Sequence, residues 1–587
     1  MPLSTNPQEE TSRITELETS TSALRERFDN DWGLFRLDEE LYKIPSTEGE
    51  WDTVISNRAP AEGFKIMDYL SYARRKLWIP ITDENVKGRN TLTKTEQLAN
   101  GCIFLADSMD EDLPDKIDLQ SLLVFYAVIR GWTAQRFMLR DEDGKLVPDE
   151  AVWDIRNTYW IVGRKRLLKA YYVRYATVEE VKDEYPGWNG TADKENNLVT
   201  IYDCFDCSES GKMAEEGVII RDEYVKEPQS IKLDYIPVRI KPCRSVPLLA
   251  DKQYADNITM MGENFMASNR NLYTAESRLL SYQFTRAGQL AKAPRVVEFD
   301  SNQGSLPPQF EKDPYVKGRT IFLDKAKGQE LKESFVPPSG VEIDKAYAQL
   351  VGLQGIGGLS PVAYGQINQA LPAQGIDILS HATMDVIKPF KKHVEKDIVW
   401  LAQEITRQYK NGDFGEYELE GYDKSSNKFM VKIKPDEIDD NWKFECELVP
   451  DLLRDKSANM NLATQAVREM LLSRQTARDE FSLVTDTDLE EEKIAKEQAR
   501  AVLDIGALEA ITALVKDYSE SPDPVKQFIL NHALVKLAQL KQQAVPQNGG
   551  NGSMPANQNT GNLNARNAQP NIPLAVRQEA LRRVQGQ

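Results

Sequence analysis

The sequence predicts an α+β fold that is mostly helical and is divided into several domains. The chain has 587 residues, which is too many for one ordinary hydrophobic core. Apolar residues recur at three- and four-residue intervals over long stretches, as in amphipathic helices. Short runs of aromatic and β-branched residues, bounded by turn residues, lie between these stretches and are typical of strands.

The charge balance is acidic, with 91 acidic and 73 basic residues and a formal net charge of −18. Proteins that wrap nucleic acid are usually basic, because neutralising phosphates drives their binding. We therefore expect this chain to repel DNA on average. That argues against a tight grip on DNA but leaves DNA open as a partner.

The amino-terminal residues and the cysteines indicate in which cellular compartment the chain is expected. Residues Met1 to Thr11 are polar, and the longest strongly apolar run, Ser121 to Ile129, is too short to span a bilayer. The chain is expected to be soluble and intracellular. A disulfide framework is not expected from an odd number of scattered cysteines, namely Cys102, Cys204, Cys207, Cys243 and Cys446.

The first half of the chain alternates helical and strand patterns. Residues 1 to 50 are polar and are interpreted as a peripheral arm or a short helix. Asp143-Gly144 between two apolar runs predicts a β-hairpin. Thr177 followed by Glu180 predicts a capping box at a helix start. Helices are expected at Leu92 to Ser108 and Leu119 to Met138, the latter kinked or turned into a strand at Gly131–Trp132, and strands at Trp153 to Ile161, Ala170 to Tyr175, Leu198 to Phe205, Val218 to Ile220 and Ile236 to Ile240.

The most regular segment predicts one long helix. Its apolar stripe repeats at alternating steps of four and three residues and should end before Pro294. Such a helix needs a partner, either a second helix of the same chain or a neighbouring subunit. The stripe consists of Tyr254, Ile258, Met261, Phe265, Ser268, Leu272, Ala275, Leu279 and Tyr282.

A candidate second helix runs from Ile376 to Tyr409, with a kink expected at Pro389. Between the two helices, Lys292 to Ser339 should form a small α/β module with strands at Arg295 to Phe299 and Arg319 to Leu323. A short helix, Glu342 to Leu353, follows it. We expect a flexible loop from Gly355 to Gly375, because a glycine run holds a helix only at an entropic cost.

The last third of the chain predicts two more strands and then helices. The strands are Phe429 to Ile433 and Trp442 to Leu448, and the tail from Pro546 to Gln587 is expected to be disordered. The expected helices are Met460 to Leu472, Leu489 to Leu503 and Ile505 to Gln543.

No set of catalytic residues converges in the sequence. The chain has only three histidines, and two of them, His381 and His393, lie too far apart on one predicted helix to share a metal. Cys204 and Cys207 have CxxC spacing without a second pair, so buried small residues are the favoured interpretation. Neither Gly-Lys dipeptide continues into the Ser or Thr that a P-loop requires. We predict no enzymatic activity, no catalytic or metal-binding residue and no cofactor. The enzyme hypothesis left open is a carboxylate-dependent hydrolase with scattered site residues.

Three stretches together carry a resemblance to a known family. They are Leu119 to Pro186, with the hairpin and the capping box; Asp251 to Gly412, with its order of long helix, insert, short helix, glycine-rich segment and long helix; and Leu472-Ser-Arg-Gln-Thr476 followed by Leu489 to Glu497. Over roughly Trp51 to Leu540 the chain resembles the portal, or head-to-tail connector, proteins of tailed bacteriophages.

The resemblance implies a portal-like arrangement of domains. In that arrangement a wing surrounds a helical stem, which ends in a clip, and a tunnel loop and a crown complete the subunit. The implied parts are an N-terminal arm at 1–50, the first part of the wing at 51–250, a stem helix at 251–291, the clip at 292–340, a short stem helix with tunnel loop and long kinked helix at 341–412, the second part of the wing at 413–500, the crown at 501–545 and a disordered tail at 546–587.

The resemblance also implies functional residues. Those of the tunnel loop are Gly355, Gly357, Gly358, Gln366, Asn368 and Gln369; those of the clip, which docks the terminase, are Gln309, Glu311, Lys312, Lys317 and Arg319; and those that pack the stem helix are Tyr254, Ile258, Met261, Phe265, Leu272 and Leu279.

A portal subunit implies a homo-oligomer, usually a dodecamer, at one capsid vertex, assembled in the host cytoplasm and retained in the virion. Double-stranded DNA would pass non-specifically through its channel during packaging and ejection. The other implied partners are the terminase large subunit, the major capsid protein, a scaffold protein and a head–tail adaptor or tail protein. The alternative is another virion structural protein, a coat or internal scaffold, although coat proteins tend to be richer in strands and lack the long helix pair.

Overall fold

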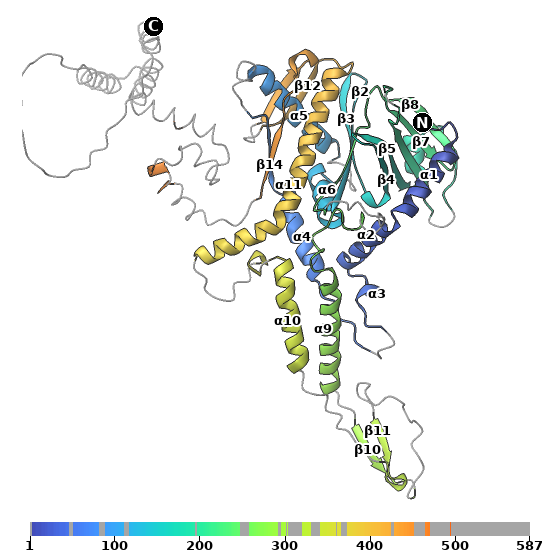
Figure 1. Ribbon diagram of the computed structural model, residues 1–587, viewed down its shortest axis with the longest axis vertical. Coiled ribbons are helices and arrows are strands. Elements are labelled where there is room, and N and C mark those ends of the chain that lie inside the picture. The colour runs from blue at the N-terminus through green and yellow to red at the C-terminus, as the bar shows by residue number, and fades with distance from the viewer. Residues whose placement is uncertain are drawn as a thin grey trace, which may run out of the picture. The chain divides into compact units, whose positions relative to one another are not determined.

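The protein is described by a computed structural model, shown in Figure 1. The chain divides into two compact units, Met1–Glu490 and Glu491–Gln587. All of the architecture below belongs to the first unit. The structure describes residues 3–450 apart from 46–50, 81–88, 111–116, 194–196, 210, 247–257, 292–294, 301, 303–319, 330–340, 360, 365–372 and 424–427, and beyond residue 450 it describes 464–465, 467–469 and 494.

The N-terminal residues form three helices that pack onto the rest of the unit. They are α1 (Pro7–Ser20), α2 (Ser22–Phe35) and α3 (Glu39–Tyr42). Leu24 and Phe28 of α2 are fully buried, and Ile14 of α1 joins the core against the large sheet. Of the two predictions for these residues, a peripheral arm or a short helix, the structure shows helices, and they turn apolar side chains such as Ile14, Leu24 and Phe28 into the cores.

A helical layer follows, made of α4 (Arg58–Ser71), the short strand β1 (Arg74–Trp78), α5 (Arg89–Asp110) and α6 (Leu119–Phe125). A π-helical turn, η3 (Tyr126–Arg130), ends α6 at Gly131, which has φ +72°. A Cβ at Gly131 would lie 2.0 Å from the Gly262 carbonyl oxygen, so only glycine fits there. The chain then leaves as a strand at Trp132, one of the two outcomes that the sequence predicts.

The strands form mainly antiparallel sheets (Figure 1). The predicted Asp-Gly hairpin is confirmed: Asp143 and Gly144 both have positive φ between β2 and β3, as a type I′ turn requires. One sheet has the order β3-β2-β9 and a larger one β4-β5-β6-β7-β8. The strands are β2 (Trp132–Glu142), β3 (Lys145–Trp153), β4 (Thr158–Val162), β5 (Leu167–Ala176), β6 (Val199–Asp206), β7 (Glu215–Ile220), β8 (Glu223–Ser230) and β9 (Val238–Pro242).

The predicted capping box is also confirmed, at helix α7 (Val178–Glu184). The Thr177 hydroxyl accepts the Glu180 backbone N–H at 3.3 Å, and the Glu180 carboxylate accepts the Thr177 N–H at 2.6 Å. These reciprocal bonds satisfy two backbone donors that the first helical turn leaves open.

The continuous helix predicted over the Tyr254 stripe is interrupted before Arg270. Helix α9 spans Arg270–Ala291, and residues 259–269 form turns and bends in which Gly262 has φ +67°. The Arg27 guanidinium donates to the carbonyls of Met261 at 3.0 Å and Gly262 at 2.9 Å, and also to that of Thr259. Because the buried Arg27 side chain bonds to these three carbonyl oxygens, they are satisfied without helical hydrogen bonds.

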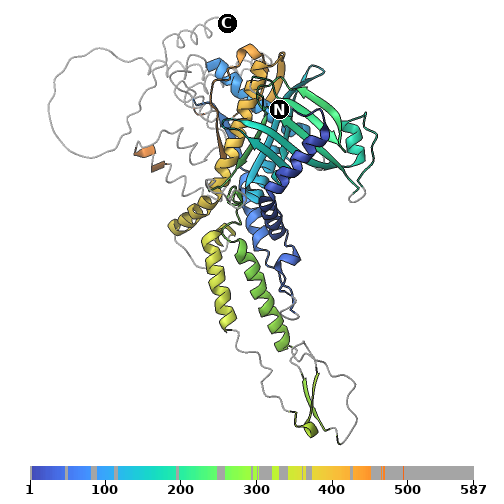
Figure 2. The same ribbon diagram turned by 45° about the vertical axis from the view of Figure 1, so that its right-hand side comes forward.

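Two strands and a second helix complete this region of the chain. The strands β10 (Arg295–Phe299) and β11 (Thr320–Asp324) pair in parallel, close to the predicted bounds. Helix α10 (Val341–Gly357) follows and packs beside α9 (Figure 2).

The longest helix, α11 (Ala373–Asn411), continues through Pro389. Figure 1 shows that its ribbon changes direction partway along its length. Helix α11 packs against α5, α6, β2 and β14. Strands β12 (Tyr417–Tyr422) and β13 (Lys428–Ile433) form a hairpin, and β14 (Glu445–Val449) pairs with β1.

The main core forms where α4, α5, α6 and α11 meet, around buried residues such as Leu98, Phe390 and Leu401. A second core lies around Trp132, Trp153 and Phe205. The fold is α+β, with helices and antiparallel sheets contributing on a similar scale, so the expectation of a mostly helical fold holds only in its coarser form. The predicted helices Leu489 to Leu503 and Ile505 to Gln543, nearly all of Met460 to Leu472, and the tail lie outside the described residues.

Candidate functional site

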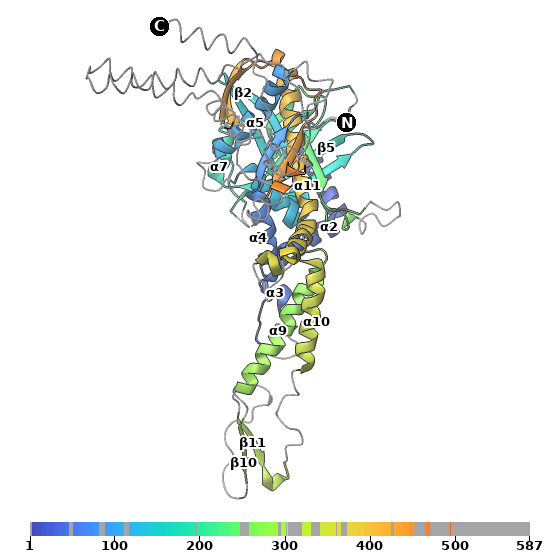
Figure 3. The same ribbon diagram turned by 90° about the vertical axis from the view of Figure 1, so that its left-hand side faces the viewer.

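Helices α9 and α10 carry most of the residues that the sequence singles out, and they lie side by side in all three views (Figures 1, 2 and 3). The insert with β10 and β11 connects them in the chain, so the two helices run in opposite directions. We define this helix pair, with the segments that hold it to the fold, as the candidate functional site.

An extended segment, residues 51–57, is docked along α9 by a ladder of hydroxyl groups. Backbone N–H groups of this segment donate to hydroxyl oxygens of α9 in the order Asp52 to Thr285 at 2.8 Å, Val54 to Ser281 at 2.9 Å and Ser56 to Ser277 at 3.1 Å. Two residues of extended chain advance about 6.6 Å, and four residues of helix advance about 6 Å. The two repeats therefore match, and the three hydroxyls face one edge of the extended segment.

A buried polar cluster joins the start of α9 to α4 and α10. The Tyr273 hydroxyl donates to the Glu62 carboxylate at 2.6 Å, and Arg58 Nε donates to the other Glu62 oxygen at 3.0 Å. Arg58 also donates to the Gln354 side chain at 2.8 Å. Burial, followed by the nearby Glu62 charge, raises the pKa of Tyr273, which keeps its proton on this bond.

The Gln354 side chain extends this cluster from α10 to α9. Its amide nitrogen donates to the Leu272 carbonyl at 3.2 Å and to Glu276 at 3.1 Å, and the Asn269 amide donates to the Gln354 carbonyl at 3.0 Å. Gln354 is fully buried. These bonds fix the register of the two helices at the end where they meet the fold.

Ion pairs anchor the first turn of α9 to α2. Arg270 donates to Asp31 at 2.6 Å and to Glu263 at 2.9 Å. Burial is the main influence on Asp31 and raises the pKa of its carboxyl group, although Arg270 opposes that shift. The Asn264 side chain adds a bond to Asp31 at 3.0 Å.

The glycines predicted to break the chain into a loop lie largely within a helix. Helix α10 includes Gly355 and Gly357, so the expected loop start at Gly355 is wrong. A Cβ at Gly357 would lie 2.6 Å from the Asn269 side-chain oxygen, and one at Gly358 would lie 2.7 Å from a Glu62 oxygen. These two glycines permit close contact with the buried cluster. Gly355 has open space at its Cβ position.

The buried side of α9 is mainly polar, and its apolar side is open. Glu276, Ser277, Ser281 and Thr285 are all at most 4% exposed, whereas Phe284 is 57% exposed. Leu272, Leu279 and Leu280 are only partly buried. In α10, Leu353 is 56% and Ile356 is 83% exposed. The helix pair therefore turns apolar side chains away from its own fold.

The predicted stem residues separate into two groups. Leu272 and Leu279 lie in α9, whereas Met261 and Phe265 lie in the turns and bends before it and Ile258 directly precedes these. Ile258 and Phe265 are buried in two different cores. Tyr254 lies outside the described residues, as do the predicted loop residues Gln366, Asn368 and Gln369 and the predicted clip residues Gln309, Glu311, Lys312, Lys317 and Arg319.

The hydroxyl ladder and the polar cluster were not among the predicted residues. Ser277, Ser281 and Thr285 recur at four-residue steps, which was a readable signal of a hydroxyl-lined helix face. Glu62, Arg58 and Gln354 left no such signal, because they come from segments almost 300 residues apart.

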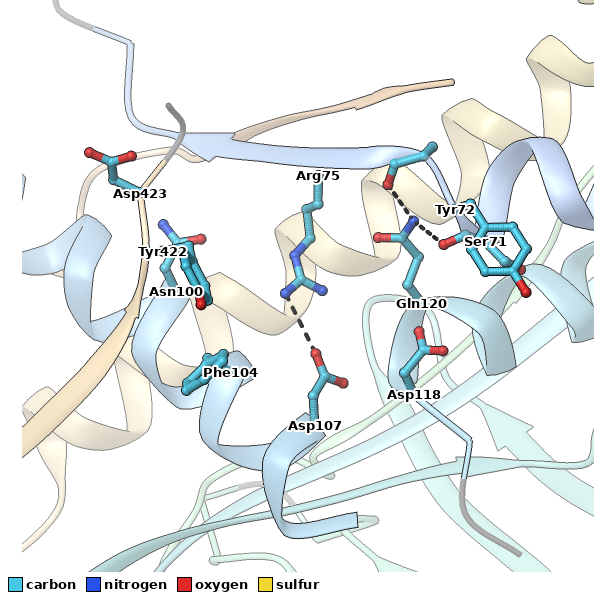
Figure 4. Close-up of a pocket in the computed structure, with 11 residues that line it drawn as sticks. Ser71, Tyr72, Arg75, Asn100, Phe104, Asp107, Asp118, Gln120, Tyr422 and Asp423 are labelled. Carbon is cyan, nitrogen blue, oxygen red and sulfur yellow. Dashed lines mark hydrogen bonds and ion pairs between the residues drawn. The ribbon is translucent and has the colours of Figure 1, made fainter. Parts of the chain in front are cut away.

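A separate cavity of about 250 Å³ lies between α5, α6, β1 and β12 (Figure 4). The Gln120 amide nitrogen donates to the carbonyls of Leu70, Ser71 and Ala73 and so closes the end of α4. Arg75 points into the cavity, 3.6 Å from Asp107. Burial raises the pKa of Asp107. The polar groups of this cavity brace neighbouring elements and form no arrangement of nucleophile and base.

The remaining candidate groups for chemistry are buried. Cys204 and Cys207 are buried, at 0% and 3% exposure, in agreement with the favoured interpretation of the CxxC spacing. Within the described residues, no three His, Cys, Asp or Glu side chains converge to hold a metal. His393 is buried in α11 with its Nε2 2.8 Å from the Thr133 hydroxyl. Every helix in the described part of the chain is too short or too polar to serve as a membrane span.

Comparison with known proteins leaves the chain unassigned, because no protein-family model and no curated protein matches it.

Proposed function

We propose that the chain is the subunit of a portal ring, through which viral DNA enters the capsid during packaging and leaves during ejection. The observation that carries the proposal is the reversed amphipathicity of α9. This helix buries hydroxyl and carboxylate groups against its own chain, whereas Phe284 is exposed and Leu272, Leu279 and Leu280 are only partly buried.

A helix in a complete monomer normally turns its apolar stripe inward. Fully burying a leucine or phenylalanine side chain stabilises a protein by roughly 1.5–3 kcal/mol. Several such side chains on α9 and α10 are open, so contact with another helix pair would be strongly favourable. A second copy of the chain would supply such a helix pair, its own α9 and α10, which could lie alongside those of the first copy.

The two open faces differ, because α9 offers leucines and Phe284 whereas α10 offers Leu353 and Ile356 beside Gly352 and Gly355. A contact between the α9 face of one copy and the α10 face of the next would be heterologous. Heterologous contacts that close produce rings. The proposal is a closed ring, with twelve copies as the number expected from the resemblance.

The order of the elements supports the same proposal. The helix pair would form the stem, the β10–β11 insert the clip, the segment after α10 the tunnel loop and the surrounding sheets the wing. The clip would dock the terminase large subunit, then a head–tail adaptor or tail protein. The major capsid protein and a scaffold protein would surround the ring in the virion. No catalytic role is proposed, and the ATPase that drives packaging would belong to the terminase.

The assembly test uses the full chain and an open-face variant. Negative-stain microscopy and native mass spectrometry of the wild type should reveal closed rings with a central hole. The double variant Phe284→Asp, Leu353→Asp should remain monomeric, because two charges would have to be buried in the contact. Its urea-unfolding midpoint should stay close to that of the wild-type monomer, since both positions are exposed.

The matched control is Val162→Asp, a 64% exposed apolar residue of β4, which should assemble like the wild type. A wild-type chain that stays monomeric at high concentration would contradict the proposal. Copy number per virion separates a portal from a coat or scaffold protein, because a portal is present about a dozen times and a coat protein hundreds of times.

A further inference from the structure

We infer that a patch of four lysines on α11 and β9 binds the phosphate backbone of nucleic acid. The patch consists of Lys388, Lys392 and Lys396 of α11 and Lys241 of β9, and is called the basic patch below. The inference assigns residues that would contact the DNA of the proposed function. It rests on that function only in taking the nucleic acid to be viral DNA.

The tertiary structure brings the two parts of the basic patch together. Arg239 of β9 donates to Asp397 of α11 at 2.7 Å, and the Cys243 thiol lies 3.7 Å from the Pro389 carbonyl oxygen. Strand residues two apart share a face, so Lys241 lies on the α11 side with Arg239. β9 therefore follows α11 along the same turns that carry the three helix lysines.

The four lysines are exposed, and none of them makes an ion pair or side-chain hydrogen bond within the described part of the chain. The β12–β13 hairpin shows the usual arrangement in this acidic chain. There Lys428, Lys432 and Lys434 each face a glutamate, at 3.1, 3.9 and 3.3 Å respectively.

Nearby acids do not neutralise the basic patch. The Asp397 carboxylate is fully buried and is used by Arg239, and Glu395 pairs with Lys391 at 3.6 Å. Asp385 is exposed one turn before Lys388 and forms no ion pair with it. The patch therefore keeps a local positive charge in a chain of net charge −18.

The spacing of the basic patch suits a repeating anion. Lys388, Lys392 and Lys396 are four residues apart, which places successive side chains about 6 Å apart along the helix. One DNA strand carries a phosphate about every 3.4 Å along the duplex axis. Three lysines in a row can therefore each reach a different phosphate. Lysine binds phosphate as a point charge, so the contact would carry no sequence preference.

The experiment measures binding of a fluorescein-labelled 30-base-pair duplex by anisotropy, from about 50 to 200 mM NaCl. The test variant is Lys388→Gln, Lys392→Gln, Lys396→Gln. The control is Lys428→Gln, Lys432→Gln, Lys434→Gln, which removes the same charge from paired positions. Both variants change exposed side chains, so circular dichroism and urea unfolding should show them folded.

Each phosphate neutralised adds about 0.9 to the slope of log K against log salt for duplex DNA. Removing three contacts should lower the slope by about 2.7. Between 50 and 200 mM salt the wild type and the control should then lose roughly 40-fold more affinity than the test variant.

The inference fails if the wild type does not bind the duplex at 50 mM NaCl, or if the two variants lower the slope equally. It also fails if poly-L-glutamate displaces the duplex at fewer charge equivalents than unlabelled DNA, which would indicate an acidic protein as the partner. Ring formation is scored on the same samples. If the chain forms rings but the lysine substitutions do not change DNA binding, only this inference is contradicted. If a monomer binds DNA through these lysines, only the ring proposal is contradicted.

Discussion

At the scale of single residues, the glycines of α10 serve two different purposes. Gly357 and Gly358 lie where a side chain would strike Asn269 and Glu62 of the buried polar cluster. Gly352 and Gly355 have no atom within 4 Å of a Cβ position. A run of glycines in a sequence does not distinguish these two situations, because the contacts come from other segments.

The two pairs of glycines should respond in opposite ways to alanine. Gly357→Ala and Gly358→Ala should each lower the free energy of unfolding by roughly 1–3 kcal/mol, because the added methyl group overpacks the cluster. Gly352→Ala should raise it by about 0.5–1 kcal/mol, because alanine favours the helix. Urea unfolding of the monomer measures both, and equal effects at positions 352 and 357 would contradict this account.

His393 is held neutral inside the fold. Its Nε2 lies 2.8 Å from the Thr133 hydroxyl, which in turn donates to the Asp397 carboxylate at 2.7 Å. The single hydroxyl proton is committed to Asp397, so the imidazole donates from Nε2. Burial lowers the pKa of His393, with Asp397 opposing that shift and Arg239 and Lys396 adding to it.

This lowered pKa predicts a stability loss in acid. The unfolded histidine titrates near pH 6.5, and the folded one at lower pH. The contribution of neutral His393 is therefore fully present above about pH 6.5 and is lost as the pH falls below it. Between pH 7.5 and 5, the free energy of unfolding in urea should fall more for the wild type than for His393→Gln. A parallel decline in both proteins would exclude His393 as the cause.

At the scale of elements, the hydroxyl ladder explains why α9 can bury a polar face. Each of Ser277, Ser281 and Thr285 accepts a backbone N–H of the 51–57 segment, and the Trp51 ring meets Tyr282 edge-on at 4.6 Å. The free-energy cost of burying a polar group is small only when the group is hydrogen-bonded. The 51–57 segment therefore covers the polar face of α9, so this face does not have to pack against apolar side chains.

Removing a rung should release the segment. Ser281→Ala leaves the Val54 N–H without its acceptor, which should cost about 1–3 kcal/mol and increase amide exchange at residues 52–56. Thr274→Ala is the control, because the Thr274 hydroxyl bonds only to the Asn271 carbonyl of its own helix. Hydrogen-exchange mass spectrometry distinguishes the two. Unchanged protection of the segment in Ser281→Ala would show that the ladder does not hold it.

At the scale of the whole molecule, like charges oppose the contacts that the open apolar faces favour. Each copy carries −18, so neighbouring copies repel at low ionic strength. Apolar contacts are not weakened by salt, whereas this repulsion is screened over about 10 Å at 0.1 M salt.

Assembly should therefore increase with salt. Raising NaCl from about 20 to 150 mM should shift the chain from monomer to ring, as measured by analytical ultracentrifugation at fixed protein concentration. Dissociation on adding salt would instead indicate an interface held by ion pairs. The Phe284→Asp, Leu353→Asp variant should stay monomeric at every salt concentration.

Several elements could be predicted from the sequence because their causes are local. The Asp-Gly turn, the Thr177 capping box and the β10 strand each depend on a few neighbouring residues. The Tyr254 stripe is also regular, yet its residues from 259 to 269 form turns and bends, not a helix. Arg27, 234 residues before Met261 in sequence, donates to the carbonyls of Met261 and Gly262, and Gly262 packs against Trp132.

The sequence by itself determined the α+β class, the Asp-Gly hairpin, the Thr177 capping box and the order of helix, insert and helix, because hydrophobic period and turn chemistry depend on adjacent residues. Only the tertiary structure decided which face of α9 is buried, where that helix begins and which lysines stay unpaired. Those outcomes depend on partners such as Glu62, Arg27 and Arg239, which reach these positions only when the chain is folded.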